Sequence, residues 1–151
     1  MPAASPSQQL SAFLAKFTPD IAARARKAIA VLRKRLPGAS VLVYDNYNAL
    51  AVGFGPNQRT SLAILSIAVW PRWVSLFFLR GKGLPDPHNV LKGGGNQVRH
   101  VVLESASDLD KPEIGALIAH ALARSQTTMP ARGGALVIKS VSAKQRPRRP
   151  A

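Results

Sequence analysis

The chain has 151 residues, with 21 Lys and Arg against 7 Asp and Glu, a formal net charge of +14 and no cysteine. That length is typical of one domain, large enough to bury a core without metal or disulfide staples. The absence of cysteine excludes a disulfide framework, thiolate metal ligands and a cysteine nucleophile. The sequence opens without a secretory-signal pattern, and no apolar run approaches the about 20 residues that a membrane-spanning helix needs. We therefore expect a soluble, cytoplasmic protein with no membrane partner.

Two helices are expected near the N-terminus, after a flexible segment at residues 1–9. A short amphipathic segment comes first, and Thr18-Pro19-Asp20 then supplies a hydroxyl cap, a first-turn proline and an acid. Apolar residues recur at helical spacing from Ile21 to Leu36. Six cations share the remaining helix surface, where a solvated exterior is the first interpretation and a nucleic-acid-binding face is the alternative. These cations are Arg24, Arg26, Lys27, Arg33, Lys34 and Arg35.

The pattern changes to strands between residues 40 and 103. Segments rich in β-branched and aromatic residues are separated by short turn-forming clusters, which require antiparallel neighbours. A last helix is expected from Asp110, with Glu113 completing a capping box, and a short strand or extended arm at residues 135–141. The sequence thus predicts an α+β fold: a two-layer domain with an antiparallel meander sheet of about five strands and helices packed on one face.

Four aromatic side chains in this region raise the question of base stacking beside cations. Core packing is the first interpretation, because most aromatic residues in strand patterns are buried. Adjacent Phe77 and Phe78 must face opposite sides of the sheet, so one of them points away from the core. A partner subunit would cover it, which makes a homodimer an expectation. The other two aromatic residues are Trp70 and Trp73.

The last residues, 142–151, are rich in Pro and Arg and have nothing apolar to bury. They predict a disordered basic tail after a single domain at residues 10–141. The tail carries four of the 21 cations, so the domain itself is basic. Association with nucleic acid through the basic helix and the tail is therefore one alternative function.

The segment from Gly81 to His100 is the strongest candidate for a site. About seventeen of its residues show no pattern of regular secondary structure, which is typical of functional or mobile loops. Its consecutive glycines allow backbone N–H groups to point into one concavity, where nearby cations would hold an anion. A glycine-rich turn is the alternative, and no Walker pattern is present. The predicted ligand-binding residues are Lys82, Lys92 and Arg99 as cations, Gly93, Gly94 and Gly95 as backbone donors, Asp86 and His88 as orienting groups, and Tyr44 and Tyr47 from a polar strand end.

The pattern of this loop also resembles a known family. Leu84-Pro85-Asp86-Pro87, followed by Gly93, Gly95 and Val98-Arg99-His100, is similar to the YdhG-like family, a bacterial group of largely unknown function. The resemblance covers residues 10–125. It implies a two-layer α/β domain with an antiparallel sheet and, for one branch, a frataxin-like iron-chaperone role. It implies no catalytic residues.

The chemistry of the sequence favours binding over catalysis. Iron needs closely placed carboxylates or imidazoles, whereas this chain has seven acids and a field that repels cations. A nucleophile elbow is also missing, so we assign no catalytic residue, metal or cofactor. We expect a non-enzymatic binding domain for an anionic small ligand or an acidic protein surface at the 81–100 loop. The alternatives are a nucleic-acid-associated protein and, by family analogy, an iron chaperone.

Overall fold

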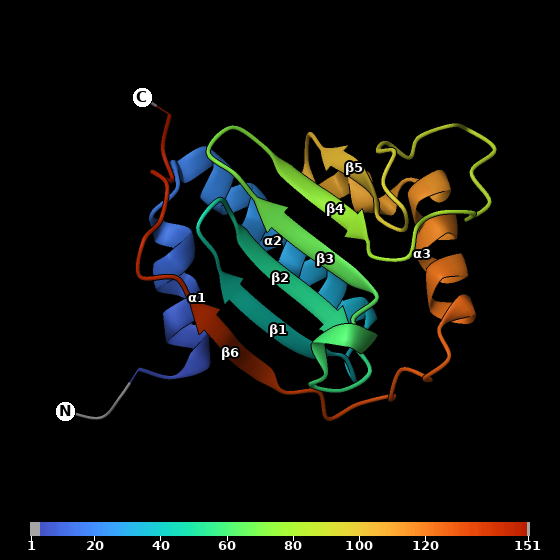
Figure 1. The fold of residues 1–151 in the computed structure, drawn as a ribbon, viewed down its shortest axis with the longest axis horizontal. Helices are drawn as coiled ribbons and strands as arrows, with labels where there is room; N and C mark the ends of the chain where they lie inside the picture. The colour runs from blue at the N-terminus through green and yellow to red at the C-terminus, as the bar shows by residue number, and fades with distance from the viewer. Residues whose placement is uncertain (1–3, 151) are drawn as a thin grey trace.

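The computed structural model describes residues 4–150, whose helices and strands form an α+β domain (Figure 1). One sheet holds six strands in the order β5-β4-β3-β2-β1-β6. Helix α2 crosses behind the sheet, and no α-helix of residues 4–150 covers the opposite face. The helices are α1 (Pro6–Ala15), α2 (Pro19–Arg35) and α3 (Pro112–Arg124), and the strands are β1 (Ser40–Asp45), β2 (Leu50–Gly55), β3 (Leu65–Val69), β4 (Val74–Phe78), β5 (Arg99–Leu103) and β6 (Leu136–Val141).

The sheet is mixed, which corrects the predicted pure antiparallel meander of about five strands. Strands β1 to β5 do pair with their sequence neighbours in antiparallel fashion. Strand β6 adds a sixth strand parallel to β1, with Val41 opposite Leu136. Parallel pairing needs a long crossover, and here α3 and the segment after it return the chain to the β1 edge.

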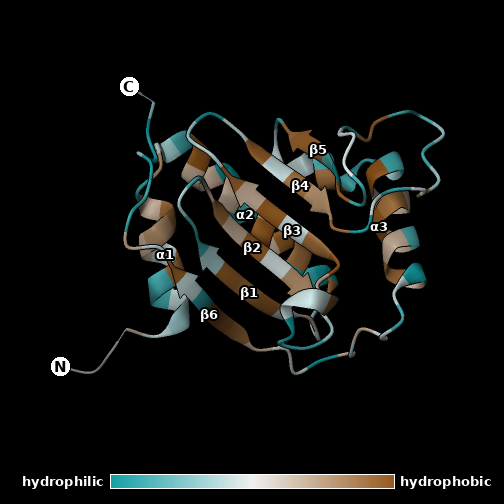
Figure 2. Cartoon of the chain, in the orientation of Figure 1, coloured by the Kyte–Doolittle hydropathy of each residue, from teal (hydrophilic) through white to brown (hydrophobic). Residues whose placement is uncertain are grey.

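The core lies between the sheet and the helices. The row Val43, Val52, Ile67 and Leu76 runs across four paired strands and is fully buried. Helix α2 meets this side of the sheet with the apolar stripe that its spacing predicts. Figure 2 shows hydrophobic residues along these strands and along the helix behind them. Phe78 belongs to this core while Phe77 lies on the other face, as predicted; the homodimer stays a prediction.

The helix starts are placed correctly, but their caps differ from expectation. Helix α2 begins at Pro19, and the hydroxyl of Thr18 makes no capping hydrogen bond. Helix α3 begins at Pro112, after Lys111 at the cap position, so the predicted Asp110 cap is wrong. Asp110 instead pairs with Arg35 of α2. The ion pair joins the turn that precedes α3 to α2, and Asp110 lies one residue before the cap position.

Both ends of the chain are more structured than their composition suggests. Residues 6–9, part of the segment expected to be flexible, belong to α1, and residues 1–3 lie outside the described range. Residues 142–150, expected to be a disordered tail, lie against the end of β1 instead. The backbone N–H of Ser142 donates to Asp45, and that of Arg146 donates to Tyr47. A basic segment can pack here because its arginines find buried carbonyl and carboxylate acceptors.

Candidate ligand-binding surface

The loop at residues 81–100 uses its two predicted key side chains to hold its own shape. The Asp86 carboxylate accepts hydrogen bonds from the backbone N–H groups of Val90 and Leu91 at 3.0 and 2.9 Å. Arg99 Nη1 donates to the carbonyl oxygens of Gly95 and Val98 at 2.6 and 2.8 Å. These contacts occupy the Asp86 carboxylate and Nη1 of Arg99, which would otherwise orient or bind an anion.

The other loop residues do not gather around one point. Gly93 has a φ of +109°, a conformation that favours glycine, whereas a Cβ at Gly94 or Gly95 would meet nothing within 4 Å. The backbone carbonyl of Lys82 accepts a hydrogen bond from Arg124. His88 lines a separate cavity of about 220 Å³ against α3. The three glycines are all exposed.

The predicted tyrosines lie far from this loop. Tyr44 on β1 is separated from Arg99 on β5 by four strand spacings, or about 19 Å. Its hydroxyl hydrogen-bonds to that of Thr60. Tyr47 follows β1 and is 47% exposed. The structure therefore divides the predicted residues between two regions: the loop, and the face of the sheet opposite α2, which we call the open face.

A trough runs along the open face. Its floor consists of the small residues Ala51, Ser66 and Ala68, and the rings of Trp70 and Phe77 also line it. Ala51 and Ala68 are direct partners across β2 and β3. The trough has a volume of about 550 Å³. Because successive strand residues point to opposite sides, large apolar residues fill the helix side while small ones leave this face hollow.

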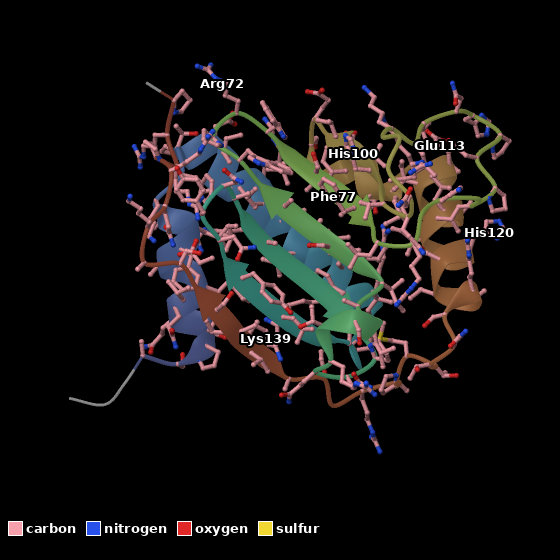
Figure 3. The ribbon with its side chains drawn as sticks, in the orientation of Figure 1. Arg72, Phe77, His100, Glu113, His120 and Lys139 are labelled. Carbon is pink, nitrogen blue, oxygen red and sulfur yellow. The ribbon has the colours of Figure 1, made fainter. Side chains whose placement is uncertain are left out.

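Four aromatic side chains form a continuous row across the same face. The ring centroids of Trp73 and Trp70 are 5.8 Å apart, and those of Trp70 and Phe77 are also 5.8 Å apart. Phe77 stacks on His100 at 5.0 Å with an interplanar angle of 22°, and Figure 3 shows these two side chains together on the open face. We call these four residues the aromatic row. Its spacings and tilts are those of favourable ring contacts.

Three arginines surround the Trp end of the row. Arg72, Arg146 and Arg149 line a groove of about 830 Å³ together with both tryptophans. We call it the arginine groove, and it shares Asn48 and Trp70 with the trough. The guanidinium of Arg146 lies over the ring of Tyr47, 5.7 Å from its centroid. The arginines are therefore gathered at the Trp end of the aromatic row, where the groove adjoins the uncharged trough.

The topology explains why these residues meet. The β1–β2 turn and the β3–β4 turn lie at the same end of the sheet, because each antiparallel hairpin reverses the chain. Strand β6 runs parallel to β1 and ends there too. It delivers residues 142–150 to the two turns. Segments distant in sequence thus form one end of the open face.

A buried ion pair fixes the last segment in this place. The guanidinium of Arg148 contacts the Asp45 carboxylate at 2.9 Å, and Lys16 contacts the same carboxylate at 3.2 Å. Burial alone would raise the pKa of Asp45. Hydrogen bonds from Gln145, Arg148 and Lys16 outweigh burial and hold the pKa below its usual value. The carboxylate is therefore ionised around neutral pH and keeps its partners.

The other end of the aromatic row is also electrostatically distinct. Lys92 and His100 exchange two backbone hydrogen bonds of 2.8 and 2.9 Å. Burial lowers the pKa of His100, and the charge of Lys92 lowers it further. His100 is therefore neutral at pH 7 and titrates below its ordinary range.

Sequence reasoning missed the residues at the turn end of the open face. The strand pattern assigns the tryptophans to the core, and Arg72, Asn46 and Asn48 are not among the predicted ligand-binding residues. The predicted meander could have indicated this cluster, because an antiparallel meander places alternate turns at the same end of the sheet. The contribution of Arg146 and Arg149 had no local signal, because it depends on the parallel pairing of β6.

No protein-family model, curated protein or solved structure matches this chain. The resemblance to the YdhG-like family stays a prediction. Within residues 4–150, three or more His, Asp or Glu side chains are nowhere arranged to hold a metal ion. No helix in that range is long and apolar enough to cross a membrane.

Proposed function

We propose that this chain binds single-stranded nucleic acid along the open face of its sheet. The observation that carries the proposal is the arginine groove, where Arg72, Arg146 and Arg149 surround the exposed end of an aromatic row. Single strands expose both unstacked bases and phosphates. Proteins that bind them combine aromatic side chains with a positively charged groove.

The aromatic row supports binding of bases. Trp73 is 45% exposed, although burying it in the core would be favourable, so its ring is accessible to a ligand. Stacking a base on an aromatic side chain contributes about 1–3 kcal/mol and tolerates any base. A duplex would use this surface poorly, because its bases already stack on one another.

The charge distribution supports binding of phosphates at the same place. The formal net charge of +14 attracts a polyanion from any direction, but the arginine groove adds a local cluster beside the rings. A guanidinium contacts two phosphate oxygens in a fixed bidentate geometry, whereas a lysine ammonium acts as a point charge. Tyr47, under the guanidinium of Arg146, extends the combination of ring and cation toward β1.

The basic face of α2 is a weaker candidate for nucleic acid. Three of its arginines already bind within the domain. Arg24 donates to the carbonyl oxygen of Leu103, and Arg35 donates to that of Leu109 at 2.7 Å. Arg26 donates to Ser11 of α1. These guanidinium groups hold α2 against its neighbours, which leaves fewer of them for phosphates.

An anion at the 81–100 loop is likewise less supported than a strand on the open face. Asp86 and Arg99 are engaged with the loop backbone, and the glycines face open solvent. Lys92 does lie next to His100 at the end of the aromatic row. A nucleic-acid strand that continues along the aromatic row would reach Lys92. One residue of the predicted loop site therefore belongs to the proposed nucleic-acid surface.

Fluorescence offers a direct test, because the sequence has two tryptophans and both lie in the arginine groove. A labelled strand of about 12 thymidines, within the usual site size, is titrated with the protein. We expect its anisotropy to rise and the tryptophan emission to be quenched with the same midpoint. Trp73→Ala should weaken binding roughly 5- to 150-fold, the equivalent of one stacked base.

A charge-matched pair of variants separates the groove from the general basic character. Arg146→Ala should weaken binding. It should also make the slope of log K against log salt concentration shallower by about 0.7, the value for one phosphate contact on a single strand. Arg33→Ala removes the same charge from an exposed position on α2 and should change much less. Equal effects of the two variants, or binding without tryptophan quenching, would contradict the proposal.

A further inference from the structure

We propose that the trough beside the arginine groove holds one unstacked adenine of the bound strand, so that the protein prefers strands containing adenine. This inference rests on the proposed function. It concerns a second cavity, and it predicts a base preference that stacking and phosphate contacts alone would not give.

The two adjoining cavities differ in chemistry. Three arginines line the groove, whereas the trough is lined entirely by uncharged residues. A nucleotide has the same division, because its phosphate is charged while its base is neutral and flat. Trp70 and Asn48 line both cavities. A nucleotide lying across this boundary would place its phosphate among the arginines and its base in the trough.

The shape of the trough suits a flat ring. Its floor is a sheet surface on which Ala51 and Ala68 are cross-strand partners, so a Cβ atom is the highest side-chain atom at either position. Trp70 and Phe77 lie beside this floor with an interplanar angle of 46°. A purine offers these rings more contact area than a pyrimidine does. The trough has an uncharged lining and offers contact with the rings of Trp70 and Phe77. It therefore favours a large, neutral, aromatic group.

The polar residues of the trough favour adenine among the purines. Asn46 and Asn48 line it from the β1–β2 turn and are exposed. A side-chain amide presents one donor and one acceptor side by side, the complement of the N6 amino group and N7 of adenine. Guanine presents two acceptors, O6 and N7, along the same edge and is typically read by arginine or lysine. Neither cation lines the trough.

The test compares strands that differ in one base. A strand of about 12 thymidines is compared with strands of the same length that carry a single central adenine, guanine or cytosine. We expect the adenine-containing strand to bind roughly 5- to 150-fold more tightly than the all-thymidine strand, the discrimination given by one bidentate base contact. The cytosine strand should lie close to the all-thymidine strand, and the guanine strand, which gains ring contact but no matching amide contact, should bind more weakly than the adenine strand.

Two variants locate the preference. Replacing Asn46 and Asn48 together by alanine should abolish the preference for adenine over guanine, because only the ring contacts, which both purines share, then remain. Neither residue has a positive φ, so alanine fits the turn, and a thermal melt verifies the fold. Arg146→Ala should weaken binding of every strand and keep the preference.

The outcomes separate this inference from the proposed function. Equal affinity for all four strands overturns the adenine site and leaves single-strand binding intact. A preference for adenine that survives in the double variant also overturns the site, because the discrimination then lies elsewhere. A failure to bind any strand overturns both proposals. The inference is supported by a preference for adenine that disappears in the double variant and persists in Arg146→Ala.

Discussion

Arg148, from a Pro- and Arg-rich segment, forms an ion pair of 2.9 Å with Asp45, and the two side chains are only 2% and 1% exposed. The same guanidinium donates to the backbone carbonyl of Asn46 and lies over the ring of Phe17. This arginine is thus a structural anchor in a segment whose composition is typical of disorder. It also positions Arg146 and Arg149 at the arginine groove, and so connects stability with the proposed binding surface.

Arg148→Met should destabilise the domain strongly, because Asp45 would lose one of its two cationic partners while remaining buried. Breaking a buried pair costs about 3–5 kcal/mol, and the remaining Lys16 contact places the expectation near 3 kcal/mol. For a domain of this size the melting temperature should fall by about 6–12 °C. The exposed Arg132→Ala serves as the control and should change little. An unchanged melting temperature for Arg148→Met would show that the buried pair does not stabilise the fold.

The stability should also depend on pH through Asp45. Its pKa in the folded protein lies below the unfolded value of 3.8, so the unfolded chain binds the proton more readily. The stabilising contribution is complete above 3.8 and is lost as the pH falls through the lower, folded pKa. Urea titrations between about pH 7 and pH 2 should show this loss in the wild type. Asp45→Asn should lack that part of the slope, and an identical slope in both proteins would assign acid sensitivity to other carboxyl groups.

Local patterns predicted the regular elements well. The helix start at Pro19, the apolar stripe of α2 and the antiparallel order of β1 to β5 all depend on residues close in sequence. Helix periodicity and turn residues encode such features directly. The position of β6 does not follow from these patterns, because its partner β1 is nearly a hundred residues away and a short apolar segment fits either edge of a sheet.

The buried pair was partly predictable. Val41, Val43 and Asp45 alternate along β1 and therefore face the same side, so the sequence already placed an acid toward the core. A buried carboxylate requires a cationic partner. With 21 Lys and Arg available, the sequence did not identify Arg148 as that partner. The choice depends on the path of residues 142–150, which only tertiary packing determines.

The sequence draws attention to the 81–100 loop rather than to the open face, and the anion site at that loop stays a prediction. The 81–100 loop stood out because glycine, proline and charged residues are concentrated in it, yet Asp86 and Arg99 serve its backbone. The open face attracted less notice because small residues such as Ala51 and Ala68 carry no chemical signal in a sequence. Their effect appears when the sheet brings them together as the floor of a trough.

Two glycines of the 81–100 loop, Gly81 and Gly94, should differ sharply in their tolerance of a side chain. A Cβ at Gly81 would lie 2.6 Å from the Cβ of Arg99 and 3.1 Å from its backbone nitrogen, so the strand must shift. We expect Gly81→Ala to destabilise the domain by about 1–3 kcal/mol, as overpacking does. Gly94→Ala meets nothing within 4 Å and should melt like the wild type. If both variants melted alike, the close approach of Gly81 to β5 would not exist in solution.

His100 should make single-strand binding depend on pH. Burial and Lys92 keep this histidine neutral at pH 7, and a phosphate brought near it by a bound strand would favour the protonated form. Affinity should therefore increase as the pH falls from about 7.5 toward 5.5, within the range where histidine titrates. His100→Phe keeps an aromatic ring on Phe77 but removes the titrating group, so its affinity should stay nearly constant over the same range. The measurement is anisotropy at fixed ionic strength, at temperatures where melts show both proteins folded. If the affinity of His100→Phe depended equally strongly on pH, the titrating group would be another residue. The bound nucleic acid would then not extend as far as His100 on β5.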